Sequence, residues 1–395
     1  MPVYNKWELT GQCLASLADN PAGASFEVLV VDNGSTDATS AECPALGRAL
    51  FGDGFKFLSP GENLNFGPGC NLGAENARGG NLFFLNNDTL ATENWAGPLL
   101  DELAGGAGAA GPLLLFPDSQ SVQHLGITFH VGFQVGHLHS HVPRGHPLAR
   151  KTRELQAVTG AALMIPKALF FEAGGFYPGY ANGCEDLELC CRVRQKGMSV
   201  TCQPESVIYH LAGASEGRYD REAENYRLLQ SRAGGCFEPD FHALAAADGY
   251  ELRPAENLDE YMAVPEERAA EHAARVGDFD EALCRDLLEK EIYWQEGYEM
   301  LAARLERAGA FEDALMVRYR QSLYTPTRDA LLRLGALAGR LGLADAATAA
   351  AAGAEEMTRQ AADKQRMAAL ARERVEFYRS AGEDRLAAMY EKRAG

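Results

Sequence analysis

The stretch at residues 79–88 (GGNLFFLNND) constrains the fold of this chain more than any other. Residues 82–85 form a short, continuous apolar run, which is typical of a buried strand in a parallel sheet covered on both faces. The run stops at Asn86, Asn87 and Asp88. Ligands of open α/β sheets bind beyond the carboxyl ends of the strands, and a carboxylate there can bind a hard divalent cation. We therefore expect Asp88 to anchor a metal-bound diphosphate. In the simpler interpretation, these residues form a turn with helix-capping side chains.

Length and charge limit the class of protein. The 395 residues are enough for two or three domains, and 46 % of them are hydrophobic, which is ample for a sizeable core. The formal net charge is −18, from 37 basic and 55 acidic residues, and no block of Lys and Arg interrupts it. Such a chain is not expected to bind nucleic acid. An anionic nucleotide is still an admissible ligand, because a bound metal ion can invert the local field.

The cysteines and the apolar segments predict the compartment. The nine cysteines show neither CxxC spacing nor an even framework, so we expect free thiols in a reducing, cytosolic protein. The first residues, MPVYN, have neither the basic nor the apolar region of a signal peptide. No apolar run approaches the roughly 20 residues that a membrane-spanning helix needs.

The N-terminal part of the sequence predicts an α/β layer. The expected elements are helices at residues 6–17 and 71–78 and strands at 26–31 and 55–58. The first strand runs into the polar turn DNGSTD. Asp32 in this turn could accept a hydrogen bond from a nucleobase or a ribose hydroxyl, or could serve only as a capping residue. The glycines between residues 61 and 73 allow close backbone approach to a ligand.

A segment at residues 122–147 is rich in histidine. The histidines in it are His124, His130, His137, His139, His141 and His146. His137, His139 and His141 alternate, so on a strand they would share one face. A transition-metal site is one interpretation. We favour the other, an exposed hairpin, because such a composition needs no ligand.

Two later stretches carry candidate catalytic groups. Glu185 and Asp186 open a predicted helix, where carboxylates either complement the helix dipole or act as a general base. Strand pieces at residues 200–203 and 206–209 lead to His210. This histidine is either structural or, together with a carboxylate, a ligand for a Mn²⁺-like ion.

Seven motifs, in order and at plausible spacing, resemble those of the family 2 glycosyltransferases, most of all the bacterial members labelled rhamnosyltransferase-like. The similarity covers roughly residues 1–235. The motifs are PVYN, VVDNGSTD, ENLNFGPGCNLG, FLNNDT, VTGAALMIPK, GGFYPGYANGCEDLELCCRVRQKG and IYHLAGAS. The resemblance implies a GT-A fold, which is a Rossmann-like α/β domain with a mixed, mostly parallel sheet.

The resemblance also implies roles for individual residues. Asp186 matches the catalytic base, with Glu185 as the alternative, and Asp88 and His210 match a metal site. Contacts with the nucleobase, ribose, diphosphate or sugar are implied for Pro2, Tyr4, Asn5, Asp32, Asn33, Ser35, Asn65, Gly67, Asn71, Asn86, Asn87, Gly160 and Ala161.

Members of this family invert the configuration at the anomeric carbon in one in-line displacement. An acceptor hydroxyl attacks while a carboxylate removes its proton, and Mg²⁺ or Mn²⁺ neutralises the departing nucleoside diphosphate. The implied donor is a UDP- or dTDP-linked sugar, and the acceptor is a carbohydrate, a lipid-linked group or a protein. The implied setting is cell-surface polysaccharide synthesis or protein glycosylation, in the cytoplasm or peripherally at the inner membrane.

Two positions depart from the family pattern. Met1 stands where the family has a full apolar strand before PVYN. We expect either a start that lies further upstream or a sheet without this inner strand and with a looser nucleobase site. Asn86 replaces the first acid of the Asp-x-Asp motif, which leaves one metal or ribose contact neutral.

The C-terminal part is rich in Ala, Glu and Arg and contains a repeat. The segment that begins at Gly277 (GDFDEAL) recurs at Gly309 (GAFEDAL) and more weakly at Gly342 and Gly382. The first two spacings, 32 and 33 residues, lie close to the 34-residue tetratricopeptide period.

We expect a GT-A domain at residues 1–240, a linker at 241–255 and an α-helical domain of tetratricopeptide type at 256–395. The helices would bind a protein partner, an acceptor or a second copy of the chain, or would only cover one side of the catalytic domain. The alternative to an active transferase is a degenerate one that acts as a protein-binding adaptor.

Overall fold

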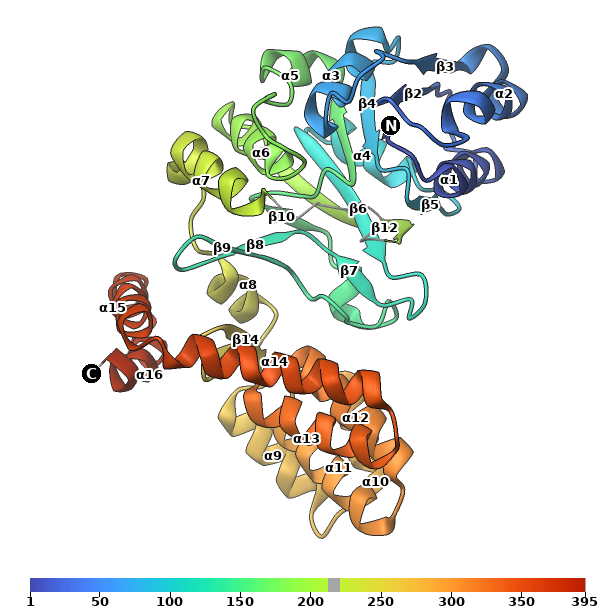
Figure 1. Cartoon of the computed structure of the whole chain (residues 1–395). Coiled ribbons are helices and arrows are strands. Elements are labelled where there is room, and N and C mark those ends of the chain that lie inside the picture. Colours follow the sequence, from blue (N-terminus) through green and yellow to red (C-terminus); the bar gives the residue numbers. More distant parts are fainter. Residues whose placement is uncertain (212–220, 395) are drawn as a thin grey trace. The chain divides into compact units, whose positions relative to one another are not determined.

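The computed structural model describes residues 1–211 and 221–394 and divides into two compact units (Figure 1). The first unit comprises Met1–Phe129 and Val135–Glu238, and the second comprises His130–Gln134 and Pro239–Gly395. The last four residues of the IYHLAGAS motif lie outside the described residues.

A small parallel sheet with flanking helices begins the first unit. Its elements are β1 (Pro2–Val3), α1 (Trp7–Asp19), β2 (Val28–Asp32), α2 (Thr39–Phe51) and β3 (Phe55–Leu58). The buried residues of α1 recur at the spacing of one helix face, as its amphipathic pattern predicts; they are Thr10, Cys13, Leu14 and Leu17. β1 is only two residues long, and Val3 pairs in parallel with Asp32.

A larger mixed sheet forms most of the rest of the first unit. Its strands among the described residues are β4 (Asn81–Leu85), β5 (Thr89–Ala91), β6 (Ala109–Leu115), β7 (Val122–His124), β10 (Arg153–Leu155), β11 (Ala162–Pro166) and β12 (Val200–His210). They follow the order β10–β12–β6–β11–β4, with β5 paired to β12 and β7 paired to β6. Every residue of β6 is buried, as expected of a central strand that runs parallel to β12.

The direction of β4 differs from the prediction. The apolar run is a strand, but it pairs antiparallel with β11, and Leu85 lies opposite Ala162. The pairs β10–β12, β6–β11, β5–β12 and β6–β7 are also antiparallel, so the larger sheet is mixed and not mostly parallel. The prediction failed because an apolar run indicates burial on both faces and contains no information on strand direction. The antiparallel pairing brings the start of β11 next to the end of β4.

Helices pack against these sheets. They are α3 (Phe66–Asn76), α4 (Gly97–Ala104), α5 (Lys167–Glu172) and α6 (Glu185–Gln195), and α7 (Glu222–Ala233) packs against α6. One cluster of buried apolar side chains, including Leu14 of α1 and Leu99 of α4, joins helices and strands into a single core. In the described part of the chain, we find no helix with the length and apolar character that crossing a membrane requires.

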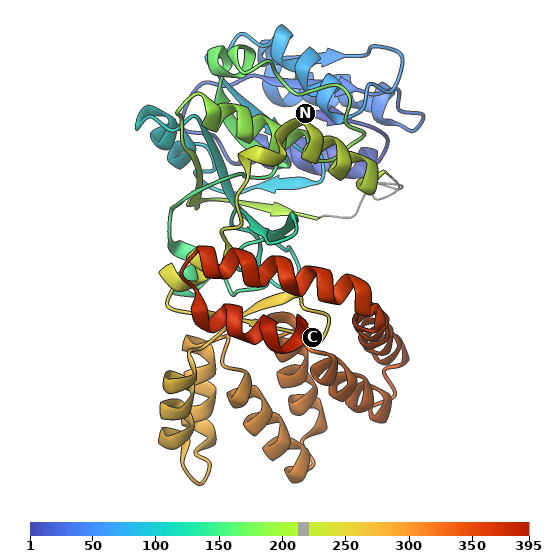
Figure 2. The same ribbon diagram turned by 90° about the vertical axis from the view of Figure 1, so that its left-hand side faces the viewer.

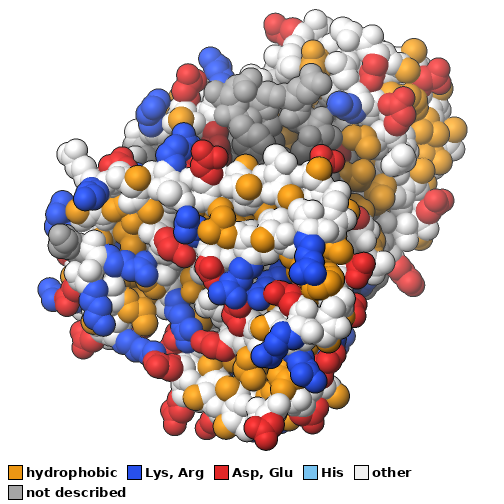
Figure 3. Space-filling model, turned by 60° about the horizontal axis from the view of Figure 1, so that its bottom comes forward, with side chains coloured by type: hydrophobic (Ala, Val, Ile, Leu, Met, Phe, Trp, Pro, Cys, Tyr) orange, Lys and Arg blue, Asp and Glu red, His pale blue; other side chains and the backbone are white. Residues whose placement is uncertain are grey.

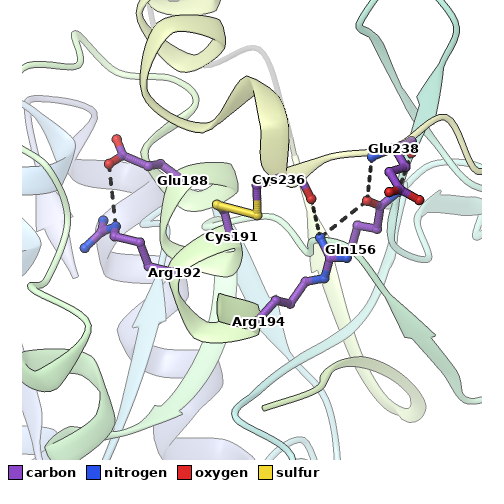
Figure 4. Close-up of a disulfide and its surroundings, with 7 residues drawn as sticks. All are labelled: Gln156, Glu188, Cys191, Arg192, Arg194, Cys236 and Glu238. Carbon is purple, nitrogen blue, oxygen red and sulfur yellow. Dashed lines mark hydrogen bonds and ion pairs between the residues drawn. A yellow bond between two sulfur atoms is a disulfide. The ribbon is translucent and has the colours of Figure 1, made fainter. Parts of the chain in front are cut away.

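One pair of cysteines corrects the expectation of free thiols. Cys191 in α6 and Cys236 in η3 (Gly234–Cys236) form a disulfide, with their Cα atoms 5.9 Å apart (Figure 4). The other seven cysteines are free. The two partners are 45 residues apart in the sequence. Spacing could not reveal the pair, because the fold brings them together.

The second unit consists mainly of helices (Figure 2). Residues 241–255, expected as a linker, form α8 (Phe241–Ala247) and β13 (Glu251–Pro254), and β13 pairs with β14 (Glu260–Ala263). The unit also includes His130–Gln134, the connection between β8 (Ile127–His130) and β9 (Gln134–His137).

The remaining described helices form consecutive pairs. They are α9 (Glu266–Val276) with α10 (Glu281–Lys290), α11 (Gln295–Ala308) with α12 (Phe311–Tyr324), α13 (Arg328–Arg340) with α14 (Ala344–Ala362), and α15 (Lys364–Ser380) with α16 (Asp384–Ala394). The four repeat glycines, Gly277, Gly309, Gly342 and Gly382, lie in the turns within these pairs and all have positive φ. Glycine adopts this conformation without steric cost, so the sequence repeat marks the turn of each pair.

Acidic and basic side chains are interspersed on the surface shown in Figure 3. Ion pairs join helices of the second unit, such as Arg320 with Glu289 at 2.7 Å and Arg333 with Glu299 at 3.2 Å. Exposed pairs of this kind contribute little stability. The mixture of signs agrees with the absence of a basic block in the sequence.

Candidate active site

The ends of two antiparallel strands bring Asp88 and His210 together. His210, the last residue of β12, lies opposite Thr89 of β5, and the Leu211 backbone N–H donates to the Asp88 carbonyl at 2.9 Å. Both side chains are buried, and His210 Nε2 lies 3.2 Å from Asp88 Oδ1. The pairing of β12 with β5 therefore brings together the two residues that the sequence analysis proposed as metal ligands.

Gln123 of β7 holds the other side of the His210 ring. Its Oε1 lies 2.5 Å from His210 Nδ1, and its Nε2 donates to the His210 carbonyl at 2.8 Å. The sequence analysis did not single out Gln123. No sequence signal marks it, because it meets His210 only across the folded sheet.

Asp88 and His210 have the atoms that a divalent cation needs. A carboxylate oxygen and a neutral imidazole nitrogen are ligands for Mn²⁺-like ions. His210 Nε2 is buried and makes no hydrogen bond within the described residues. Over that same part of the chain, no cluster of three or more His, Cys, Asp or Glu side chains is arranged for a metal. The two residues fit a metal site that draws its remaining ligands from a bound substrate or water.

Asp186 is fixed beside the residues that lead into β11. It lies in the first turn of α6, and its Oδ2 accepts the Gly160 N–H at 2.6 Å. A Cβ on Gly160 would lie 3.1 Å from Asp186 Cβ, so the approach is close enough to favour glycine. The next residue, Ala161, accepts the Asn86 N–H at 2.9 Å through its carbonyl. A short chain of contacts thus connects Asp186 with the segment that carries Asp88.

Glu185 precedes Asp186 but faces a different partner. Its Oε2 accepts the Gly183 N–H at 2.6 Å, and the residue is 4 % exposed. This contact ties Glu185 to the turn just before α6.

The turn after β2 collects the predicted nucleobase and ribose residues. Asp32 is buried at the end of β2, where its carboxylate accepts from the Ser35 N–H at 2.9 Å and from the Ser40 hydroxyl at 2.5 Å. Asn5 has a positive φ, and its Oδ1 accepts from the Thr36 N–H at 2.7 Å. The Asn5 N–H donates to the Ser35 hydroxyl at 2.8 Å. PVYN and DNGSTD therefore form one hydrogen-bonded structure.

The second predicted donor loop joins this turn. Asn33 Nδ2 donates to the Asn65 carbonyl at 3.2 Å, and Asn65 has a positive φ immediately before α3. In α3, a Cβ on Gly67 would lie 3.2 Å from the Cβ of Phe176, and a Cβ on Gly69 would lie 3.3 Å from the Cβ of Pro2.

Three predicted residues differ from the others in what they contact. Asn71 donates to the Phe176 carbonyl at 2.8 Å and accepts from the Phe176 N–H at 2.9 Å, so its amide serves the fold. Asn87 Nδ2 donates to the Thr10 hydroxyl at 2.9 Å. Tyr4 is 52 % exposed. Its side chain is accessible to a ligand, whereas the other two amides are engaged within the protein.

The histidine-rich segment does not form the expected strand face. Of the three alternating histidines, only His137 lies in a strand, because His139 and His141 have positive φ in the turns that follow β9. His124 is buried, and its Nδ1 lies 2.8 Å from His137 Nδ1. Burial, followed by the neighbouring His137 and His210, lowers the pKa of His124 well below its ordinary value. His124 is therefore neutral at physiological pH.

A second set of contacts supports α6, the helix that carries Asp186. Besides the disulfide, Arg232 of α7 donates to Glu188 of α6, with Nη2 2.7 Å from Oε1, and its guanidinium lies 3.4 Å from the centre of the Tyr177 ring. Arg194 donates to the Cys236 carbonyl at 3.0 Å (Figure 4). These bonds fix the orientation of α6 relative to α7.

The first unit, a mixed sheet with helices packed against it, has the GT-A fold. Residues 1–166 match the family model described as "Glycosyl transferase family 2". The match covers less than half of the chain.

Two curated relatives share part of the chain. One is the uncharacterized protein y4gI of Sinorhizobium fredii, which is 28 % identical over 237 residues. The other is the O-antigen biosynthesis protein RfbC of Myxococcus xanthus, which is 30 % identical over 227 residues. The matches cover 58 % and 54 % of this chain, and the chain spans only 26 % and 17 % of the lengths of these relatives.

A solved structure with a similar arrangement is that of GalNAc-T7 with UDP, GalNAc and Mn²⁺. It is 17 % identical with a TM-score of 0.49, and the match covers 59 % of this chain and 47 % of that one. This likeness is too remote to bear on substrate or metal.

Proposed function

We propose that this chain is a metal-dependent, inverting glycosyltransferase that moves a sugar from a nucleoside-diphosphate sugar to an acceptor hydroxyl. The observation that carries the proposal is the joint placement of two kinds of group. The Asp88–His210 pair, with Nε2 and Oδ1 3.2 Å apart, can bind a cation. Asp186 is held by Gly160, and the next residue, Ala161, accepts the N–H of Asn86, two residues before Asp88. An inverting transfer needs a base for the acceptor and a cation for the leaving group.

In the proposed mechanism, Asp186 removes the proton of the attacking hydroxyl. The Gly160 N–H fixes the position of one carboxylate oxygen, and the first turn of α6 sets its direction. Asp88 and His210 would hold Mg²⁺ or Mn²⁺, which as a Lewis acid neutralises the charge on the departing nucleoside diphosphate. Glu185, which is bonded to Gly183, supports the turn that begins α6.

The donor nucleotide is proposed to bind at the turn after β2. Asp32, Ser35 and Asn5 form a connected polar structure at the carboxyl end of a parallel strand, which is where α/β folds bind nucleotides. We propose UDP- or dTDP-linked sugars as donors, and we assign Asn71 to the fold and not to donor contact, because Phe176 engages its amide.

The setting of the reaction is proposed from a relative. The name of RfbC refers to O-antigen biosynthesis, and we propose cell-surface polysaccharide synthesis for this chain as well. We further propose that the paired C-terminal helices are of tetratricopeptide type and bind the acceptor, a protein partner or a second copy. The support for this part is the coincidence of the repeat glycines with the turns of the pairs.

Calorimetric titration of UDP and dTDP, each with and without Mn²⁺, tests the proposal. We expect metal-dependent binding to the wild type that Asp88→Ala abolishes. Asp101→Ala, at an exposed position of α4, serves as the control and should bind like the wild type. If neither nucleotide binds in the presence of Mn²⁺, the transferase is degenerate and the adaptor function becomes the better explanation.

A further inference from the structure

The contacts of Gln123 determine which nitrogen of His210 carries a proton. A backbone carbonyl can only accept a hydrogen bond, so the amide nitrogen of Gln123 must face the His210 carbonyl, at 2.8 Å. The amide oxygen then faces His210 Nδ1, at 2.5 Å. Because this oxygen also only accepts, Nδ1 must be the protonated nitrogen.

With the proton on Nδ1, the second nitrogen is the one whose lone pair a cation can use. That atom, Nε2, is buried and lies 3.2 Å from Asp88 Oδ1. The two bonds of Gln123 hold both the ring and the backbone of His210, so they fix the direction of the lone pair as well as its chemical form. A histidine that binds a metal through one nitrogen commonly donates from the other to an oxygen atom.

We propose that Gln123 is a positioning residue for the metal site, because it fixes His210 as the tautomer that coordinates a divalent cation through Nε2. The inference rests on the proposed function and adds to it a residue that binds neither the metal nor the substrate. A glutamate at this position would keep the acceptor for Nδ1 and lose the donor for the carbonyl. A leucine would lose both.

Mn²⁺ binding to the full chain tests the inference without any measurement of activity. Free Mn²⁺ is followed by electron paramagnetic resonance in titrations with and without UDP. Gln123→Leu is expected to weaken Mn²⁺ binding about 10- to 100-fold, whereas Gln123→Glu, which still accepts from Nδ1, is expected to retain most of the affinity. Gln12→Leu, at an exposed position of α1, is the matched control and should bind like the wild type.

The tautomer itself gives a second readout, which a purely structural role would not change. In metal-free protein with ¹⁵N-labelled histidine, the His210 signals are identified by their loss in His210→Asn. The wild type and Gln123→Glu should carry the proton on Nδ1, and Gln123→Leu should lose this preference. The inference is overturned if the Gln123→Leu variant keeps both the His210 tautomer and the Mn²⁺ affinity of the wild type. It is also overturned if the Gln123→Glu variant loses as much Mn²⁺ affinity as the Gln123→Leu variant.

The same Mn²⁺ titrations distinguish failure of the proposed function from failure of the role of Gln123. A wild type that binds no Mn²⁺ with or without UDP would overturn the metal site, and the role of Gln123 with it. A wild type that binds Mn²⁺ through Asp88 while Gln123→Leu binds equally well would leave the metal site intact and overturn only the role of Gln123.

Discussion

At the scale of single residues, the proposed mechanism separates proton transfer from donor binding. Asp186→Asn keeps the shape of the side chain and can still accept the Gly160 N–H, but it is a poor base. We expect kcat to fall about 10²- to 10⁴-fold, while UDP binding in the presence of Mn²⁺ stays within experimental error. Kinetic and calorimetric assays of the same preparation check this. A larger fall for Glu185→Gln than for Asp186→Asn would move the base to Glu185.

A second prediction at this scale concerns the glycine that holds Asp186. A Cβ on Gly160 would lie 3.1 Å from Asp186 Cβ and 3.4 Å from its Oδ2. Gly160→Ala should therefore displace the carboxylate and lower kcat more than it lowers thermal stability, since a displacement of about 1 Å can cost on the order of 10²-fold in rate. Gly80→Ala, where a Cβ meets nothing within 4 Å, is the matched control and should keep full activity.

At the scale of helices and strands, the sequence predicted where the strands lie in the chain better than how they pair. β3 lies at the residues expected, and β12 contains both predicted strand pieces with a register shift between Gln203 and Val207. These elements are encoded locally, in apolar runs and turn residues. The direction of β4 was wrong, because direction depends on its partner β11, which is far away in the sequence.

In the candidate site, too, the locally encoded features could be predicted and those that depend on distant segments could not. Asp88, Asp186 and His210 could be singled out because each follows a strand or begins a helix, where ligands and capping groups both occur. Gln123 and the Cys191–Cys236 disulfide could not be predicted, because each depends on a contact between segments that only the fold brings together.

The disulfide between α6 and the segment after α7 should stabilise the first unit. It closes a loop of 45 residues, which should stabilise the first unit by about 2–4 kcal/mol through the smaller entropy of the unfolded chain. Cys191→Ala combined with Cys236→Ala should lower the midpoint of thermal unfolding, and dithiothreitol should lower that of the wild type by a similar amount.

The control for this prediction is Cys190→Ala, which alters a buried free thiol next to the bond. This variant should still respond to dithiothreitol, whereas the double variant should not. Thiol labelling of unfolded protein that was purified without reductant counts the free cysteines directly. Nine labelled thiols, where we expect seven, would contradict the presence of the disulfide.

At the scale of the whole molecule, the division into units does not follow the order of the sequence. The repeat glycines predicted the helical pairs, but nothing in the sequence marked His130–Gln134 as part of the second unit. These residues reach a buried polar cluster around Glu260. His130 Nδ1 lies 3.4 Å from Glu260 Oε2, and Arg374 Nη2 donates to Gln134 Oε1 at 3.3 Å.

Glu260 should make the stability of the second unit depend on pH. Burial raises the pKa of this carboxyl, but hydrogen bonds from His130 and Tyr378 and the charge of Arg374 outweigh burial, and the net pKa is below the ordinary value of 4.5. The unfolded chain therefore binds the proton more readily than the folded one. The stabilisation is complete above pH 4.5 and is lost as the pH falls through the lowered pKa of the folded state.

Replacing Glu260 by a neutral residue should destabilise the second unit at any pH, as protonation of Glu260 does in acid. Glu260→Gln leaves the buried Arg374 without its carboxylate, so we expect a loss of about 3–5 kcal/mol in the free energy of unfolding at pH 7. Circular dichroism at 222 nm from pH 7 to pH 3.5 would follow the helices, and the variant should show a flatter pH dependence than the wild type.

The control is Glu266→Gln, which alters an exposed glutamate that pairs with Arg385 at 2.8 Å and should change stability by less than about 1 kcal/mol. Equal pH slopes for Glu260→Gln and the wild type would contradict the role of this carboxylate. Residues 130–134 would then contribute no stability that depends on the charge of Glu260.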